Sequence, residues 1–241
     1  MQNHGSLEGK AALVTGGSRG IGLAVAHKLG ELGENVTICG RDRKRLAEAV
    51  DELKGKGIKA LGIHADVTLA TDVKLLVQQA ENSFGPIEIL VNNAGIGYFA
   101  PSHEASEATW NSVLDTNLKS VFLLTKAVAP GMIARHGGHI INIASLAGRS
   151  AFKGGGIYCA SKWGLLGFTQ CVAEDLREHG IRVSAICPGS VATEFSPHTG
   201  MDVRKMLQPG DVAHAVEMLV TQASQSFISE VHIRPTQKPS S

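Results

Sequence analysis

Tyr158 and Lys162 are the two residues whose types and spacing best suit proton chemistry in this sequence. On a helix, side chains four residues apart lie one turn apart on the same face. A lysine ammonium beside a phenol favours the phenolate, so this pair predicts a tyrosine with a lowered pKa. Such a tyrosine can protonate a carbonyl oxygen or take the proton from an alcohol. The spacing by itself also arises often by chance.

A serine adds to this pattern. Ser145 directly follows the apolar run His139–Ala144, which has the composition of a buried strand. A hydroxyl at the end of such a strand could hold a substrate carbonyl beside the tyrosine. Taken alone, Ser145 could equally cap a turn.

A glycine-rich run, TGGSRGIG at residues 15–22, lies between a predicted strand and a predicted helix. Glycine allows a sharp turn and a close approach of backbone N–H groups to a pyrophosphate. The start of the helix adds a partial positive charge. Glycine also serves simple packing in many such turns, but the position between a first strand and a helix favours a dinucleotide site.

The end of the second predicted strand indicates which dinucleotide would bind. An NAD site usually has an acidic residue about 20 residues past the glycine-rich turn. Here Arg41 stands at that point, and Arg19 could reach the same group from the turn. Because arginine suits bidentate phosphate contacts, we expect NADP(H). Two alternatives remain: Arg41, Arg43 and Arg45 could form a solvated helix start, or Asp42 could bind the ribose.

Short apolar segments alternate with helical patterns along the whole chain, which predicts parallel strands joined by crossover helices. The predicted strands are Ala11–Thr15, Asn35–Cys39, Ile58–His64, Ile87–Val91, His139–Ala144, Arg182–Ile186 and Glu230–Ile233. Helical patterns include Ile21–Leu32, Lys44–Lys54 and Asp72–Phe84. We therefore expect one α/β domain over residues 1–241, doubly wound, with loose termini at residues 1–6 and 236–241. Its ligand should bind at the carboxyl ends of the strands.

Composition excludes several classes of protein. A net charge of +1 gives no broad basic face, so we expect no nucleic-acid partner. No apolar run approaches the roughly 20 residues that span a bilayer, so we expect no membrane segment. The four cysteines form no paired motif and Met1–Lys10 lacks an apolar targeting core, which indicates a cytoplasmic protein with free thiols. The histidines show no metal-ligand spacing, so we expect no metal.

These motifs together resemble the classical short-chain dehydrogenase/reductase family. The resemblance runs from about residue 7 to residue 189 and continues more weakly to the end. Its elements, in order, are TGGSRGIG, Asp66-Val67, Asn92-Asn93-Ala94-Gly95, Asn117, Ser145, Tyr158-Cys159-Ala160-Ser161-Lys162 and Pro188-Gly189. The resemblance implies a Rossmann-type domain with a seven-stranded parallel sheet and helices on both faces.

The resemblance also implies roles for matching residues. Tyr158 would be the general acid/base, Lys162 would bind the nicotinamide ribose and lower the tyrosine pKa, and Ser145 would orient the substrate. Asn117 would hold a water for a proton relay. The implied cofactor-binding residues are Gly16, Ser18, Arg19, Gly20, Ile21, Gly22, Arg41, Asp66, Val67, Asn93, Ala94, Gly95, Tyr158, Lys162, Pro188, Gly189, Val191 and Thr193.

The implied activity is NADPH-dependent reduction of a ketone or 3-oxoacyl group to a hydroxyl, as in the 3-oxoacyl-(acyl carrier protein) reductases. The substrate would be a small carbonyl or alcohol or an acyl thioester, with an acyl carrier protein as a further partner. The alternatives are a stand-alone carbonyl reductase for small ketones or ketoesters, and a non-catalytic NADP(H)-binding regulator.

The sequence also predicts a substrate lid and a subunit interface. A substrate lid is expected over Thr193–Pro209, with Phe195, Pro197 and Met201 among its apolar residues, and with Ile96, Tyr98, Leu146 and Phe152 as further wall candidates. The family resemblance implies a homotetramer assembled partly through helices that contain Trp110–Val128 and Ser161–Leu176, although these apolar positions could equally be core.

Overall fold

The computed structural model describes residues 7–195 and 201–239, and within them seven strands form one parallel sheet. The order across the sheet is β3-β2-β1-β4-β5-β6-β7. The strands are β1 Ala11–Thr15, β2 Asn35–Gly40, β3 Ala60–His64, β4 Ile87–Asn92, β5 Gly138–Ile143, β6 Ile181–Pro188 and β7 Glu230–Ile233. The expected doubly wound, seven-stranded parallel sheet is confirmed.

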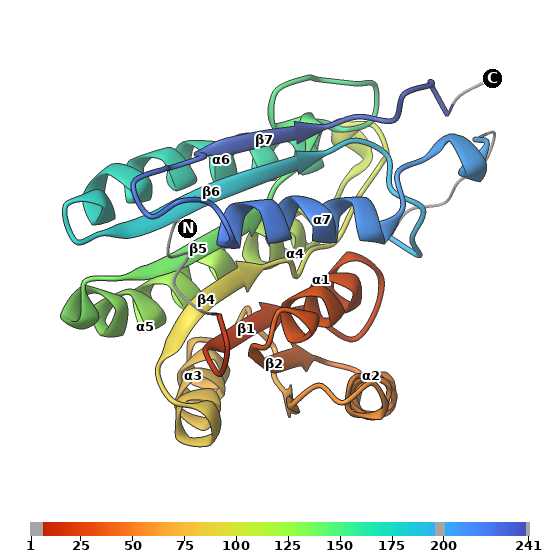
Figure 1. Cartoon of the computed structure of the whole chain (residues 1–241). Helices are drawn as coiled ribbons and strands as arrows, with labels where there is room; N and C mark the ends of the chain where they lie inside the picture. Colours follow the sequence, from red (N-terminus) through yellow and green to blue (C-terminus); the bar gives the residue numbers. More distant parts are fainter. Residues whose placement is uncertain (1–6, 196–200, 240–241) are drawn as a thin grey trace.

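Helices cover both faces of the sheet (Figure 1). One face packs against α1, α2 and α7, and the other against α3, α5 and α6. In Figure 1, α7 and α1 lie side by side across the near face, and they are in contact. The helices are α1 Gly20–Glu31, α2 Arg43–Gly55, α3 Ala70–Phe84, α4 Glu107–Leu114, α5 Ser120–Arg135, α6 Gly156–Arg177 and α7 Pro209–Val220.

The central strands are apolar on both sides because both sides are covered. All five residues of β1 are buried. Along β1, Leu13 faces the cluster that contains α3 and α5, whereas Val14 faces the cluster that contains α1 and α7. Full burial of each such side chain contributes about 1.5–3 kcal/mol to folding.

The predicted start of the third strand differs from the observed start of β3. The strand expected from Ile58 begins at Ala60 instead. Gly57 has a φ of 80° after α2, and the Ile58 N–H donates to the Leu53 carbonyl, so these residues end the helix. The Ile58 side chain packs into the core beside Gly30, which explains its apolar character without a strand.

The chain reverses its direction of progress across the sheet between β3 and β4, so the carboxyl ends of β1 and β4 flank a switch point. Sheets of this kind bind ligands in the crevice at that point. The motifs of the sequence lie there: the glycine-rich turn follows β1, and the Asn92–Gly95 motif begins at the end of β4.

The carboxyl-terminal segment differs from expectation in its described part. Residues 236–239, expected to be loose, pass along the ligand pocket, and the Asp202 N–H donates to the Pro239 carbonyl at 2.8 Å. Residues 1–6 and 240–241 lie outside the described residues, as does Pro197 of the expected lid. Across residues 7–195 and 201–239, no helix is both long enough and apolar enough to span a membrane.

Candidate active site

A cavity of about 1750 Å³ runs along the carboxyl ends of the strands. It is large enough for a dinucleotide together with a second small molecule, since ligand pockets typically measure about 300–1,000 Å³. Most of the predicted residues line it: Gly16, Ser18, Arg19, Gly20, Ile21, Arg41, Asp66, Val67, Asn93, Ala94, Gly95, Ser145, Tyr158, Lys162, Pro188, Gly189, Val191 and Thr193. Gly22 and Asn117 are the two predicted residues that do not line it.

The turn after β1 forms a cradle at the start of α1. Gly16 has a φ of 62°, which L side chains rarely adopt. A Cβ on Gly22 would lie 2.3 Å from the Gly16 carbonyl oxygen, so only glycine lets the turn fold back on the helix. The unpaired N–H groups of a helix start favour a phosphate at such a position. The cradle therefore fits the pyrophosphate of a nicotinamide dinucleotide.

Hydrogen bonds join this turn to β4. The Thr15 hydroxyl accepts from the backbone N–H groups of Asn93 and Ala94, both at 3.0 Å. The Asn93 side chain donates to the carbonyls of Thr15 at 2.9 Å and Gly16 at 3.2 Å. The Asn92–Gly95 motif thus holds two strand ends together, and Asn93 acts mainly on the backbone of the turn.

Asn117 lies behind the pocket wall on a π-helical turn, Asp115–Lys119, between α4 and α5. Its Oδ1 accepts from the Ile96 N–H at 2.8 Å, and its Nδ2 donates to the Ile96 carbonyl at 2.9 Å and to the Ser161 hydroxyl at 3.0 Å. The Ser161 hydroxyl donates in turn to the Tyr158 carbonyl at 2.7 Å. Asn117 is buried, as expected for a packed helix, and it ties the loop after β4 to the start of α6.

Tyr158 is buried on the first turn of α6 and faces the cavity. Burial raises the pKa of its phenol to about 12, while a hydrogen bond with the Ser145 side chain acts in the opposite direction. The Ser145 hydroxyl also accepts from the Ala147 N–H at 3.1 Å, so it caps a turn and faces Tyr158 at once. The turn-capping alternative for Ser145 is confirmed, and its role in holding a substrate carbonyl stays a prediction.

Lys162 lies one turn further along α6, with its Nζ 5.8 Å from the centre of the Tyr158 ring. The ammonium donates to the Ile143 carbonyl at 2.9 Å, and burial lowers its pKa to about 8. The expected lowering of the tyrosine pKa is not found among the described residues, because burial disfavours the phenolate and is the largest influence on the Tyr158 pKa. The helical pairing of the two residues is correct, but the direction of the tyrosine shift is not.

Aromatic side chains enclose this end of the cavity. The Phe99 ring lies 5.3 Å from the Tyr158 ring, and the Phe195 ring lies 5.8 Å from it, centre to centre. Phe152 lies 6.1 Å from Phe99. Phe99, Phe152 and Phe195 are each more than 40% exposed, so they offer apolar surface to a second ligand beside Tyr158. Phe152 and Phe195 were expected here, whereas Phe99 takes the place expected of Tyr98.

The opposite end of the cavity is polar and charged. The Asp66 carboxylate accepts from the N–H and hydroxyl of Thr68. Burial by itself would raise the Asp66 pKa, but these hydrogen bonds and the charge of Arg41 lower it overall. One Glu194 oxygen accepts from Arg19 at 2.6 Å and from Arg45 at 2.7 Å. Arg45 is therefore part of the pocket wall and not only a solvated helix start.

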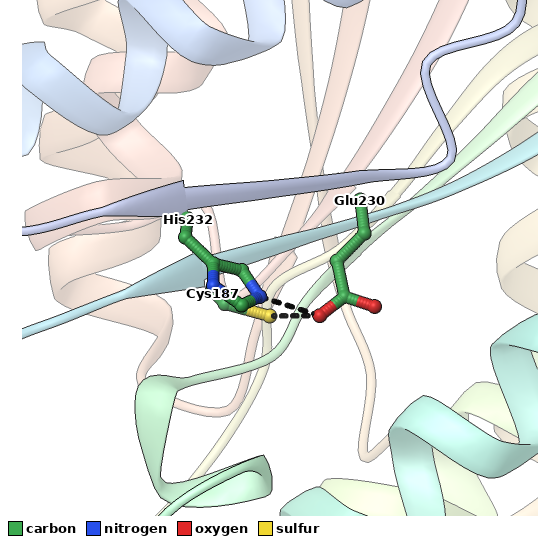
Figure 2. Close-up of side chains that lie close together, drawn as sticks. All are labelled: Cys187, Glu230 and His232. Atoms are coloured by element: carbon green, nitrogen blue, oxygen red, sulfur yellow. Dashed lines mark hydrogen bonds and ion pairs between the residues drawn. The ribbon is translucent and has the colours of Figure 1, made fainter.

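A second cluster, formed by Cys187, Glu230 and His232, lies where β6 pairs with β7 (Figure 2). Glu230 accepts from His232 at 2.6 Å, and the Cys187 Sγ lies 3.8 Å from the same oxygen. The Cys187, Glu230 and His232 ligand atoms all lie within 4.8 Å of one another, a grouping that sequence spacing did not reveal.

This cluster is better suited to bracing than to binding a metal. Arg149 donates to both Glu230 oxygens, at 3.1 and 2.6 Å, so neither oxygen is unpartnered. Burial raises the pKa of the Cys187 thiol to about 12, which opposes the thiolate that a metal needs. Arg149 follows Ser145 closely in the chain, so its ion pair links the Ser145 turn to β7.

The residues that line the cavity can together bind a dinucleotide and exchange a proton. A neutral phenol, a neighbouring hydroxyl and a buried lysine meet at one end of a cavity whose other end holds cationic groups. The glycine cradle at the start of α1 lines the same cavity. Such a site can bind a dinucleotide lengthwise and exchange a proton at an oxygen of a second ligand.

The chain is similar to known proteins over nearly its whole length. A family model described as short chain dehydrogenase matches residues 10–203. The 3-oxoacyl-(acyl-carrier-protein) reductase of Staphylococcus epidermidis is 34% identical over 236 residues, which cover 93% of this chain and 97% of that protein.

Two solved structures extend the comparison. A metagenomic short-chain oxidoreductase in complex with NADP shares 43% identity and a TM-score of 0.85, covering 97% of this chain and all of that chain. Actinorhodin polyketide ketoreductase with NADPH shares 33% identity and a TM-score of 0.88, covering 94% of this chain and 96% of that chain.

Proposed function

Because this chain belongs to the short-chain dehydrogenase family, we propose that it is an NADPH-dependent oxidoreductase that reduces a ketone or a 3-oxoacyl group to a hydroxyl. The observation that carries the proposal is the meeting of Tyr158, Ser145 and Lys162 at one end of a dinucleotide-sized cavity. When bound, the nicotinamide cofactor supplies the hydride.

The proton comes from the protein. Tyr158, whose pKa of about 12 keeps the phenol neutral, donates its proton to the oxygen of the reduced carbonyl. The Ser145 hydroxyl, beside the phenol, holds that oxygen in place. The Lys162 ammonium supplies positive charge close to the ring as charge develops on the oxygen. Asn117 positions the start of α6 through Ser161, and it is a positioning residue in this scheme.

The adenosine end favours NADP(H) over NAD(H). Arg19, Arg41 and Arg45 line that end, and arginine suits a ribose 2′-phosphate. The glycine cradle fits a pyrophosphate because a side chain at Gly22 would collide with the turn. The solved relatives with bound NADP or NADPH support the same choice.

The aromatic wall of the cavity beside Tyr158 indicates the substrate class. The apolar surfaces of Phe99, Phe152 and Phe195 suit an acyl chain or an aryl ketone. Similarity to a 3-oxoacyl-(acyl-carrier-protein) reductase and a polyketide ketoreductase favours a 3-oxoacyl thioester, with an acyl carrier protein as its donor. A stand-alone reductase of small ketones is the second candidate, because the same open aromatic wall would accept them.

The first experiment is NADPH oxidation, followed by absorbance, with an acetoacetyl thioester, aryl ketones and ketoesters, repeated with NADH. We expect turnover with NADPH and preference for the thioester. Preference for small ketones would select the second candidate. Cofactor binding without turnover of any substrate would instead favour a regulator.

Tyr158→Phe tests the proton donor. The expected loss of turnover is about 10²–10⁴-fold, the usual contribution of a positioned acid, while NADPH binding stays nearly unchanged. Retained carbonyl reduction would mean that another group donates the proton.

For the cofactor, Arg41→Asp should weaken the preference for NADPH over NADH, and an unchanged preference would contradict a 2′-phosphate contact by Arg41.

A further inference from the structure

The Glu194 carboxylate lies where a ligand anion would be expected. One of its oxygens accepts from Nη1 of Arg19 at 2.6 Å and from Nη1 of Arg45 at 2.7 Å. Arg19 stands at the start of α1, and Arg45 stands in the first turn of α2. Glu194 comes from a third place, the segment that follows β6. Three distant parts of the chain thus meet at one oxygen atom.

Two guanidinium groups that converge on a single oxygen form an anion site. Arginine pairs with carboxylate and phosphate in the same way, through charge-assisted hydrogen bonds. The site belongs to the pocket wall, which Arg41 and Asp42 also line, and the Asp42 carboxylate lies 3.7 Å from Nε of Arg45 as a second, weaker partner. Among the described residues, the Arg41 guanidinium makes no hydrogen bond or ion pair, so a third cation is available beside the pair.

Given a 2′-phosphate bound at Arg19 and Arg41, we propose that Arg45 is a further residue that selects this phosphate, and that Glu194 is an internal competitor which the phosphate displaces. The proposal rests on the proposed cofactor, NADP(H), and gives roles to two residues, Arg45 and Glu194, that lie outside the sequence motifs. A cofactor without the 2′-phosphate leaves Glu194 on its two arginines.

The strengths of the competing contacts make the exchange feasible. The side chains of Glu194, Arg19 and Arg45 are 65%, 57% and 44% exposed, so water and salt weaken their ion pairs. A phosphate monoester carries about 1.5–2 negative charges at pH 7 and offers three acceptor oxygens, against one charge and two oxygens on a carboxylate. It can therefore engage both guanidinium groups more strongly than Glu194 does.

The exchange would also reach the substrate end of the cavity. Phe195 directly follows Glu194, and its ring is one of the aromatic contacts of Tyr158. The Glu194 contact to α1 and α2 therefore restrains the same segment that covers the proton donor. Release of Glu194 by the 2′-phosphate would free this wall only when the preferred cofactor is bound.

Calorimetric titration of the full chain tests the proposal, with NADP⁺, NAD⁺ and adenosine 2′,5′-bisphosphate as ligands. Glu194→Gln keeps the shape of the side chain but removes its charge. We expect this variant to bind NADP⁺ and the bisphosphate about three- to tenfold more tightly than the wild type, from two exposed ion pairs lost. NAD⁺ affinity should change less than twofold.

Two further variants test the role of Arg45 and provide a control. Arg45→Gln should weaken binding of both 2′-phosphate ligands by a similar factor and leave NAD⁺ unchanged. Glu174→Gln is the matched control, because Glu174 pairs with Arg177 at a similar exposure outside the cavity lining. It should leave all three affinities unchanged. In a crystal structure with NADP⁺, the Glu194 carboxylate should no longer contact Arg19 and Arg45.

The outcomes separate this inference from the proposed function. A wild type that binds NADP⁺ no better than NAD⁺ would overturn both the proposed cofactor, NADP(H), and the competitor role of Glu194. A wild type that prefers NADP⁺, with a Glu194→Gln variant of unchanged affinity, would overturn the competitor alone. Persistence of the Glu194 ion pairs in the NADP⁺ complex would do the same.

Discussion

At the scale of single residues, burial decides the charge of the two central groups. Tyr158 and Lys162 are both removed from water, and burial disfavours the charged form of each. The pKa of the phenol therefore rises to about 12, and that of the ammonium falls to about 8. The phenol therefore keeps its proton near neutral pH and has one to give, whereas the lysine is close to losing its charge.

A pH profile checks this assignment. We expect kcat/KM for carbonyl reduction to be level below about pH 8 and to fall above it, as Lys162 loses its proton. Tyr158 cannot cause that fall, because its phenol stays protonated until about pH 12. Steady-state kinetics from pH 6 to 10 would measure it, with the exposed Lys74→Met as control. A level profile up to pH 10 would contradict the role given to the Lys162 charge.

At the scale of elements, the turn between β1 and α1 depends on glycine at a point of contact. Gly22 approaches the Gly16 carbonyl so closely that no Cβ fits, and the Asn93 side chain fills the remaining space. Because Asn93 also donates to Thr15 and Gly16, the turn and β4 form one unit. A change in the turn should therefore affect both cofactor binding and the packing of strand ends.

Gly22→Ala tests this dependence. Its Cβ would lie 2.3 Å from the Gly16 oxygen and 2.5 Å from the Asn93 Nδ2, so the turn must move. We expect a loss of about 1–3 kcal/mol in the free energy of unfolding, and at least tenfold weaker NADP⁺ binding. Urea unfolding and calorimetry would measure the two effects. Gly55→Ala is the control, because its Cβ would meet no atom within 4 Å.

The brace between the Ser145 turn and β7 is a second element-scale feature. Arg149 is the main cause of the low pKa of Glu230, about 2, against an ordinary 4.5; His232 contributes less, and burial opposes both. Because the folded pKa lies below the unfolded one, the pair stabilises the protein above about pH 4.5. That contribution disappears as the pH falls from 4.5 toward 2.

Arg149→Gln should therefore lower the free energy of unfolding by about 1 kcal/mol at pH 7, because the Arg149 side chain is 40% exposed and water weakens the ion pair. The difference from the wild type should be much smaller at pH 2.5, close to the folded pKa of Glu230, than at pH 7. Urea unfolding at pH 7, 4 and 2.5 would measure it. An equal difference at all three pH values would show that Arg149 acts by packing and not through the Glu230 charge.

At the scale of the whole molecule, the outer faces of α5 and α6 carry large apolar side chains. Phe122 and Trp163 are 46% and 52% exposed, and the Phe122 ring packs on Phe168 at 6.5 Å. Exposed apolar surface of this kind is typical of a subunit interface. The homotetramer expected from the sequence stays a prediction, and these helices are the surface through which it would form.

Charge substitution tests that surface. Phe122→Glu and Trp163→Glu should each shift the protein to smaller assemblies in light scattering after gel filtration. Leu75→Glu is the matched control: Leu75 is also 52% exposed, but it stands on α3, and its variant should assemble like the wild type. If both interface variants kept the wild-type mass, assembly would not depend on α5 and α6.

The sequence by itself determined the strands, the order of helices and the residues around Tyr158. Local patterns suffice for these, because a parallel strand buried on both faces must be apolar throughout, and a phosphate turn requires glycine. Its few errors at this level, such as the start of β3, concern residues that are buried for another reason.

The tertiary structure alone decided which distant groups meet. The contact of Glu194 with Arg19 and Arg45 joins residues far apart in the chain, and so does the contact of Arg149 with Glu230. The rise of the Tyr158 pKa likewise depends on how many elements exclude water from the phenol. Ion pairs and desolvation depend on distance in space, for which spacing along the chain carries no signal.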